Sequence, residues 1–198
     1  METALHQLTN SFRAPLRALL YWTKQICVHL KILGYRYRRL TQDNLPQHIR
    51  RILVVCKGNI CRSPLAEAYL RTRLQEQGYA VSVRSAGLET SLGKPAHPLT
   101  KHIGEQYGFS MEAHKTQPLL KEFVEEADLI LVMEFSHLRR LLKVYPEAEE
   151  KIFLLGQSKG NAPPLEITDP YNGTLQDFQH CFQKIKESCD HLIQRIWC

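Results

Sequence analysis

The chain has 198 residues and a formal net charge of +6, from 26 Lys and Arg against 20 Asp and Glu. Residues 1–51 hold nine of the basic residues against Glu2 and Asp43, a balance of +7, so the remainder is close to neutral at −1. The basicity therefore belongs to the N-terminal segment. It does not predict a nucleic-acid partner, because the chain carries no recognised nucleic-acid-binding module.

Residues 1–49 predict a basic amphipathic helical extension. Within residues 12–40, apolar residues at helical spacing form one stripe (Leu16, Leu19, Leu20, Ile26, Cys27 and Leu30) among seven Lys and Arg. Three interpretations stay open: this stretch contacts an anionic membrane surface, docks on an acidic partner, or packs on the following domain. Lys24, His29 and Lys31 interrupt every window of about 20 residues, which excludes a membrane-spanning helix. No cleaved signal peptide is evident either.

Residues 50–198 predict one α/β domain, because short apolar runs alternate with helical patterns. The predicted strands cover residues 52–55, 79–83, 128–133 and 151–155, and the predicted helices cover residues 64–77, 99–107, 118–126, 135–145 and 174–197. Such alternation predicts a three-layer domain, with a four-stranded parallel twisted sheet flanked by helices. We expect the functional site at the carboxyl ends of the strands.

The segment directly after the first predicted strand, residues 56–64, reads CKGNICRSP. Gly58 and Asn59 are the residue types that adopt left-handed backbone most cheaply, so the loop can turn its amides inward around an anion. Pro64 favours the first turn of a helix, whose positive end then faces Cys56. With Arg62 beside it, this field should lower the pKa of the Cys56 thiol well below its ordinary value of about 8.5.

A nucleophilic thiolate requires an acid to protonate the leaving oxygen, and we expect this acid from the irregular segment 156–173. The best candidate is Asp169, in the sequence Asp169-Pro170-Tyr171. Loops held by a rigid scaffold commonly carry catalytic groups. Tyr171 could then form a wall against an aromatic substrate ring.

The loop and the Asp-Pro-Tyr segment together resemble the low-molecular-weight protein tyrosine phosphatases, over roughly residues 50–198. The resemblance implies that Cys56 forms a phosphocysteine, that Arg62 clamps the phosphate, and that Asp169 serves as general acid and then as base. No metal or other cofactor is implied. The implied phosphate-binding residues are Lys57, Gly58, Asn59, Ile60, Cys61 and Arg62.

The resemblance also implies supporting roles. Ser63 would stabilise the departing thiolate, Asn59 would fix the loop shape, and His114 would support Asn59. Cys61 would close a reversible disulfide with Cys56 under oxidants, although a small buried loop residue is the plainer interpretation. The chain departs from the family pattern at two positions, where Glu134 replaces the usual Asp and His137 replaces a common Asn.

The other cysteines are Cys27, Cys181, Cys189 and Cys198, and their spacing fits neither a zinc site nor a secreted disulfide framework. A reducing, cytoplasmic compartment fits them best. If residues 12–40 contact lipid, the protein would lie at the inner membrane surface. By analogy with bacterial members of the family, the expected partner is a phosphotyrosine protein, such as an autophosphorylated bacterial tyrosine kinase.

Three alternatives to a tyrosine phosphatase remain. Arsenate reductases share the fold and loop but need further redox cysteines, and residues 84–128 contain none. Protein arginine phosphatases carry Thr before the second loop cysteine, where this chain has Ile60. A non-catalytic phosphoprotein-binding module would have lost the chemistry, whereas this chain keeps Cys56, Arg62, Ser63 and Asp169.

Overall fold

The computed structural model describes residues 45, 46, 48–159 and 165–197, so the predicted extension lies almost entirely outside the described residues. The described strands are β1 (Arg51–Cys56), β2 (Ser82–Gly87), β3 (Leu129–Val132) and β4 (Ile152–Leu154). The α-helices are α2 (Arg62–Glu76), α3 (Pro98–Gln106), α4 (Lys121–Glu126), α5 (Phe135–Val144) and α6 (Leu175–Trp197). Short 3₁₀ helices cover Pro146–Lys151 and Leu155–Lys159. Among the described residues, no helix is long and apolar enough to cross a membrane.

The four strands form one parallel sheet in the order β2-β1-β3-β4. Strand β1 is central, and Cys56 at its carboxyl end pairs with Gly87 of β2. Every residue of β1 after Arg51 is buried, as is every residue of β3 and β4. This apolar centre places the carboxyl ends of β1 and β3 side by side, where loops can bring functional groups together.

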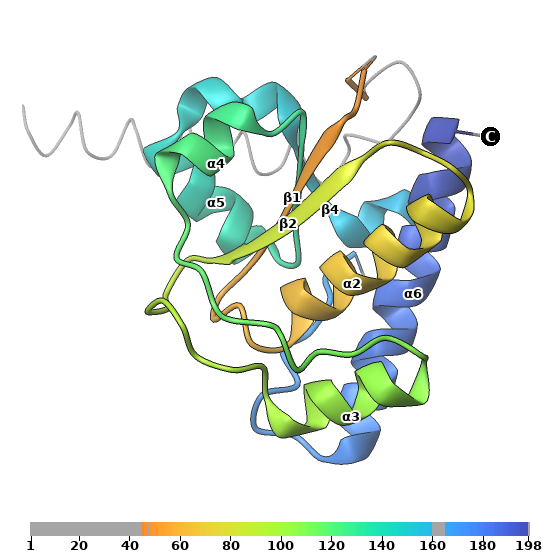
Figure 1. The fold of residues 1–198 in the computed structure, drawn as a ribbon. Helices are drawn as coiled ribbons and strands as arrows, with labels where there is room; N and C mark the ends of the chain where they lie inside the picture. The colour runs from red at the N-terminus through yellow and green to blue at the C-terminus, as the bar shows by residue number, and fades with distance from the viewer. Residues whose placement is uncertain (1–44, 47, 160–164, 198) are drawn as a thin grey trace, which may run out of the picture. The chain divides into compact units, whose positions relative to one another are not determined.

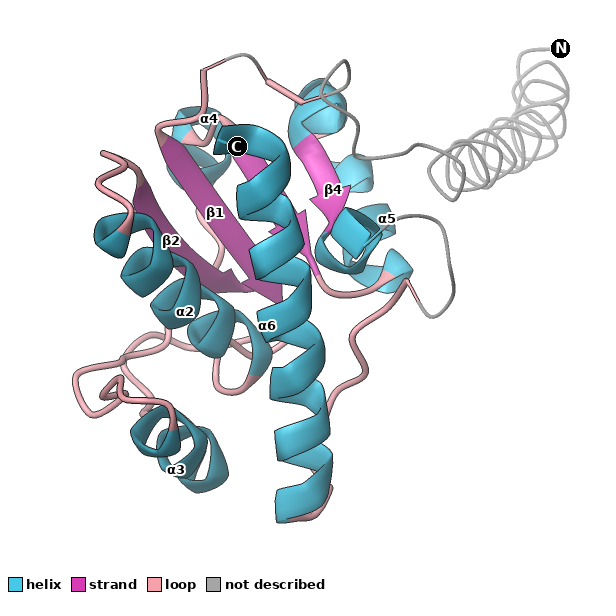
Figure 2. Cartoon of the chain, turned by 90° about the vertical axis from the view of Figure 1, so that its right-hand side faces the viewer, coloured by secondary structure: helices cyan, strands magenta, loops and turns pink. Residues whose placement is uncertain are grey.

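Helices cover both faces of the sheet. Helices α2 and α6 lie on one face and α4 and α5 on the other (Figure 1, Figure 2), with α3 packed at the lower end of α6. The core between the sheet and α2 and α6 includes Leu65, Leu70, Phe178 and Phe182, all fully buried. The predicted α/β class and four-stranded parallel sheet are therefore confirmed.

Two predicted boundaries are wrong. The second strand was expected at residues 79–83, but pairing begins at Ser82 and runs to Gly87. The apolar residue that suggested an earlier start, Tyr79, instead follows a turn and stacks on Trp197, with ring centroids 5.3 Å apart. The helix expected over residues 118–126 begins only at Lys121, because the backbone on either side of Pro118 pairs with Gly87.

Candidate active site

The loop between β1 and α2 curls as its sequence predicts. Asn59 has a φ of 54°, the only positive φ among the described non-glycine residues. Its backbone N–H donates to Cys56 Sγ at 3.2 Å. Helix α2 begins directly after the loop, with Arg62 as its first residue, so its N-terminus faces the loop.

The Asn59 side chain links the loop to its surroundings and fixes the direction of several hydrogen bonds. Its Oδ1 accepts from the backbone N–H of Gln117 at 2.9 Å. Its Nδ2 therefore donates to Ser63 Oγ at 2.9 Å and to Ser85 Oγ at 2.8 Å. Because Ser63 Oγ already accepts from Asn59, its own proton is available to Cys56 Sγ, which lies 3.0 Å away.

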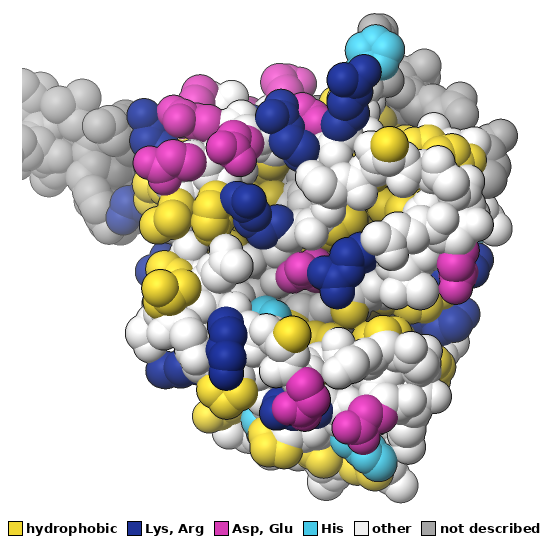
Figure 3. Space-filling view, in the orientation of Figure 1, with side chains coloured by type: hydrophobic (Ala, Val, Ile, Leu, Met, Phe, Trp, Pro, Cys, Tyr) yellow, Lys and Arg dark blue, Asp and Glu magenta, His cyan; other side chains and the backbone are white. Residues whose placement is uncertain are grey.

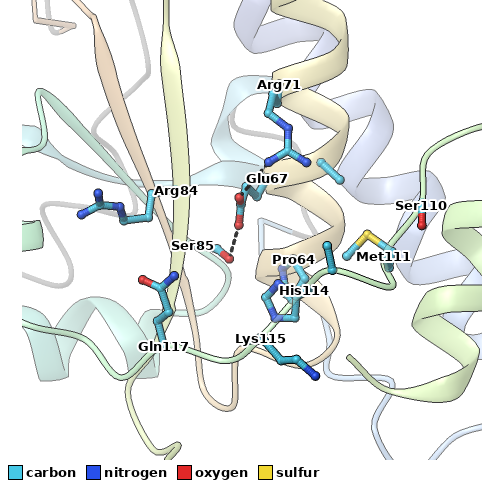
Figure 4. A pocket seen from close by; sticks show the side chains of 12 residues that line it. Pro64, Glu67, Arg71, Arg84, Ser85, Ser110, Met111, His114, Lys115 and Gln117 are labelled. Atoms are coloured by element: carbon cyan, nitrogen blue, oxygen red, sulfur yellow. Dashed lines mark hydrogen bonds and ion pairs between the residues drawn. The ribbon is translucent and has the colours of Figure 1, made fainter. Parts of the chain in front are cut away.

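The chain of hydrogen bonds continues from Ser85 to the molecular surface. Ser85 Oγ donates to Glu67 at 2.5 Å, and Arg71 pairs with the same carboxylate at 3.1 Å. These groups line a hollow of about 240 Å³ between α2, β2 and the segment of His114, and Arg84 also belongs to its lining (Figure 4). In the same orientation as Figure 1, this face is hollowed near its middle, with acidic and basic side chains side by side (Figure 3).

His114 supports the loop between β1 and α2 from outside it. Its Nε2 is 2.8 Å from the backbone oxygen of Asn59, a contact across 55 residues of sequence. Two groups outside the loop therefore hold Asn59: Gln117 binds its side chain and His114 binds its backbone carbonyl group.

Arg62 is 1% exposed and is shared between two carboxylates. Its Nη1 donates to Glu134 and to the backbone oxygen of Ile167, and its Nη2 donates to Asp169 at 2.5 Å. Burial lowers the pKa of Arg62, but Cys56, Asp169 and Glu134 together raise it, so the guanidinium stays charged. Its buried Nε has no hydrogen-bond partner, so this donor of the guanidinium fork is not committed to another protein group.

Cys56, Arg62 and Asp169 line one cavity of about 600 Å³, together with Lys57, Gly58, Ile60, Cys61, Glu89, Tyr171, Asn172, Gly173 and Asp177. The structure thus brings the predicted nucleophile, anion clamp and acid to one place. Tyr171 is 51% exposed at this cavity, and its ring lies edge-on to His97 at 5.7 Å.

Among the described residues, no three His, Cys, Asp or Glu side chains are grouped as metal ligands. The four described cysteines, Cys56, Cys61, Cys181 and Cys189, are all buried and free. Burial raises the pKa of Cys61 to about 12, so this thiol is protonated at neutral pH. Its redox role stays a prediction.

Comparison with known proteins shows to which family the chain belongs. The family model described as low molecular weight phosphotyrosine protein phosphatase matches residues 51–197. The chain belongs to this family. It is 37% identical over 148 residues to the probable low molecular weight protein-tyrosine-phosphatase EpsP of Ralstonia solanacearum, across 75% of this chain and 97% of that protein.

Two solved structures illustrate the range of this phosphatase family. The tyrosine phosphatase AmsI of Erwinia amylovora has a TM-score of 0.70 and 30% identity, across 76% of this chain and 95% of its own. The arginine phosphatase YwlE of Geobacillus stearothermophilus has a TM-score of 0.68 and 31% identity, across 74% of this chain and 92% of its own. The fold alone therefore does not separate the two activities.

Several groups at this phosphatase site were not predicted from the sequence. The sequence marks Glu134 only as a departure from the family pattern, yet it binds Arg62 directly. Ser85, Glu67 and His97 carry no local motif and reach the loop only through the tertiary fold. His137 is also buried; its burial and then Arg62 lower its pKa to about 4, although Glu134 acts against them, so it is neutral at pH 7.

Proposed function

We propose that the chain hydrolyses phosphotyrosine in proteins through a phosphocysteine intermediate. The observation that carries the proposal is the single cavity that Cys56, Arg62 and Asp169 share. In the first step Cys56 Sγ attacks phosphorus, the sulfur–phosphorus bond forms, and the bond to the phenolic oxygen breaks while Asp169 protonates that oxygen. In the second step Asp169 takes a proton from water, whose oxygen attacks phosphorus and releases phosphate and the Cys56 thiolate.

The hydrogen-bond directions around the nucleophile support this assignment. Ser63 and the Asn59 N–H both face Cys56 Sγ and stabilise negative charge on the sulfur. The unpartnered Nε of Arg62 is a donor that could bind an equatorial phosphate oxygen. A phosphate bound there competes with Asp169 for Nη2 and releases its carboxyl group for proton transfer.

The side chains at the cavity mouth favour phosphotyrosine over the alternatives. Ile60 and Tyr171 provide apolar surface for a phenyl ring, and Ile60 stands where arginine phosphatases carry Thr. Residues 84–128 lack the extra cysteines of an arsenate reductase. A non-catalytic binding module would not need Ser63 and Asp169 in contact with the nucleophile and the clamp.

Phosphate release from phosphotyrosine and phosphoarginine peptides, with a chelator present, tests the proposal. We expect rapid phosphotyrosine turnover by the wild type, none by Cys56→Ser, and a loss of about 10²–10⁴-fold in kcat for Asp169→Asn. Asp177→Asn is the matched control, because Asp177 lines the same cavity but bonds to Thr174 rather than to Arg62. Phosphopeptide binding without turnover by the wild type would identify a reader instead, and turnover of phosphoarginine alone would identify an arginine phosphatase.

We further propose that the physiological substrate is a phosphotyrosine protein of a bacterial cell, such as an autophosphorylated tyrosine kinase. The basic amphipathic stretch of residues 12–40 would hold the enzyme at the cytoplasmic side of the inner membrane, near such a kinase. Partitioning on anionic vesicles at low salt tests this location. Equal partitioning of the full chain and of a chain without residues 1–47 would count against it.

A further inference from the structure

We call the cavity that Cys56, Arg62 and Asp169 line the catalytic cavity. A separate hollow of about 410 Å³ adjoins it on the side of α5. Four residues line both spaces: Lys57, Arg62, Glu89 and Asp169. The rest of its lining is Leu88, Glu134, Ser136, His137 and Arg140. We call this space the α5 pocket. Because the exposed side chains of Lys57 and Glu89 line both spaces, the two adjoin at the surface, and residues beside a phosphotyrosine bound in the catalytic cavity would lie next to the α5 pocket.

The lining of the α5 pocket holds three cations and three carboxylates, and Arg62 is paired with two of these carboxylates, Glu134 and Asp169. The rim, which we define as the more exposed Lys57, Glu89 and Arg140, is left with two cations and one carboxylate. Glu89 pairs with Arg140 and lies 3.7 Å from Lys57 Nζ, so two cations share one carboxylate. The hydrogen bond from Arg140 is the largest cause that holds the pKa of Glu89 below its ordinary value, so Glu89 is ionised at neutral pH. The three side chains are about half exposed or more, and the rim keeps a surplus of one positive charge.

The cations of this rim have capacity for another anion. The 3.7 Å separation between Lys57 Nζ and Glu89 exceeds hydrogen-bond distance, and such exposed pairs contribute little stability. Deeper in the lining, His137 is 4% exposed, and its Nδ1 has no hydrogen-bond partner. A polar group left unpartnered in a buried wall is unusual unless a ligand or water completes it.

We propose that the α5 pocket binds an acidic side chain of the protein substrate, close in sequence to the phosphotyrosine. The inference rests on the proposed function and names the substrate feature that the same site selects. A substrate carboxylate placed between Lys57 and Arg140 turns two cations and one anion into a balanced group of four charges. A basic side chain at the same place meets both cations, so the pocket also excludes basic neighbours.

Matched phosphotyrosine peptides test the proposal. Each peptide carries Glu, Gln or Lys at one position within two residues of the phosphotyrosine and Ala at the others. We expect the wild type to prefer Glu over Gln in kcat/KM by about three- to fivefold at one position, and to disfavour Lys there. This preference should fall as salt rises, because the rim charges are exposed and screened.

Variants of two neighbouring arginines locate the effect. Arg140→Gln should reduce the Glu-to-Gln ratio to about one, and Arg140→Lys should keep part of it. Arg139→Gln removes the same charge from the next position of α5, but Arg139 does not line the pocket, so the ratio should match the wild type. The ratio compares two peptides on one protein, so partial loss of folded enzyme does not affect it.

Two results would overturn the proposal: no wild-type preference at any of the four positions, or the same preference in Arg140→Gln as in Arg139→Gln. Turnover of a small aryl phosphate by the wild type separates these results from failure of the proposed function. An enzyme that cleaves the aryl phosphate but shows no peptide preference retains the chemistry and lacks the subsite. A chain that cleaves neither aryl phosphate nor peptide would overturn both.

Discussion

Asn59 should stabilise the folded protein more than any other single polar side chain of the loop. It is fully buried, its backbone is left-handed at φ 54°, and its side chain makes three hydrogen bonds, to Ser63, Ser85 and the N–H of Gln117. The change to test is Asn59→Ala, which deletes all three bonds and leaves two of their partners, Ser63 and Ser85, buried.

The expected cost follows from these contacts. Each net hydrogen bond contributes about 1 kcal/mol, so the three lost bonds destabilise by about 3 kcal/mol. Left-handed backbone costs alanine about 1 kcal/mol more than asparagine, so the free energy of unfolding should fall by about 4 kcal/mol. At about 2–4 °C per kcal/mol for a domain of this size, the melting temperature should fall by about 8–16 °C.

Urea unfolding followed by circular dichroism measures the effect. The matched control is Asn172→Ala, because Asn172 is exposed beside the same cavity and should change stability by at most about 0.5 kcal/mol. A loss for Asn59→Ala within 1 kcal/mol of that control, a margin of about one hydrogen bond, would refute the reasoning. It would mean that water or a loop rearrangement replaces the three bonds.

Two further predictions concern titrating groups. Brief alkylation at pH 7 should label Cys56 well before Cys61, whose pKa of about 12 keeps it protonated; equal labelling of both in a peptide map would contradict the burial of Cys61. His137 has a folded pKa of about 4, below its unfolded value of about 6.5, so its stabilising effect is complete above pH 6.5 and is lost as the pH falls towards 4. The free energy of unfolding of the wild type should therefore fall by up to about 3 kcal/mol more than that of His137→Asn between pH 7 and pH 4. Urea unfolding of both proteins at several pH values measures this, and the same pH dependence in both would refute it.

The sequence predicts best those features whose residues are close together in the chain. Residues 56–64 contain the turn formers, the nucleophile and the helix start in one continuous stretch, so loop and helix follow from the sequence. Strand β2 was misplaced because Arg84, Ser85 and Gly87 look like loop residues. Ser85 is buried there because it connects Asn59 to Glu67, a requirement that only the assembled site imposes.

Groups that act across long sequence separations were harder to predict. Asp169 lies 107 residues from Arg62, and it was predictable because it stands in an irregular segment and belongs to the Asp-Pro-Tyr motif. Glu134 lies 72 residues from Arg62 and has no motif of its own beyond the departure from Asp. His97 illustrates the same limit: its backbone N–H donates to the Ile60 oxygen at 3.0 Å, and its ring contacts Tyr171, although no pattern links the three residues.

The two carboxylates on Arg62 are suited to different tasks. Glu134 shares Nη1 with the Ile167 oxygen; burial raises its pKa, but the bond and charge of Arg62 outweigh this and hold the pKa below its ordinary value. Glu134 therefore stays ionised as the counterion of a buried guanidinium, which could not remain buried without one. Asp169 contacts the guanidinium only through Nη2, accepts a second bond from the Tyr171 N–H, and is 36% exposed at the cavity, so an incoming phosphate can displace it from Arg62 without removing that counterion. This difference supports Asp169, rather than Glu134, as the proposed general acid.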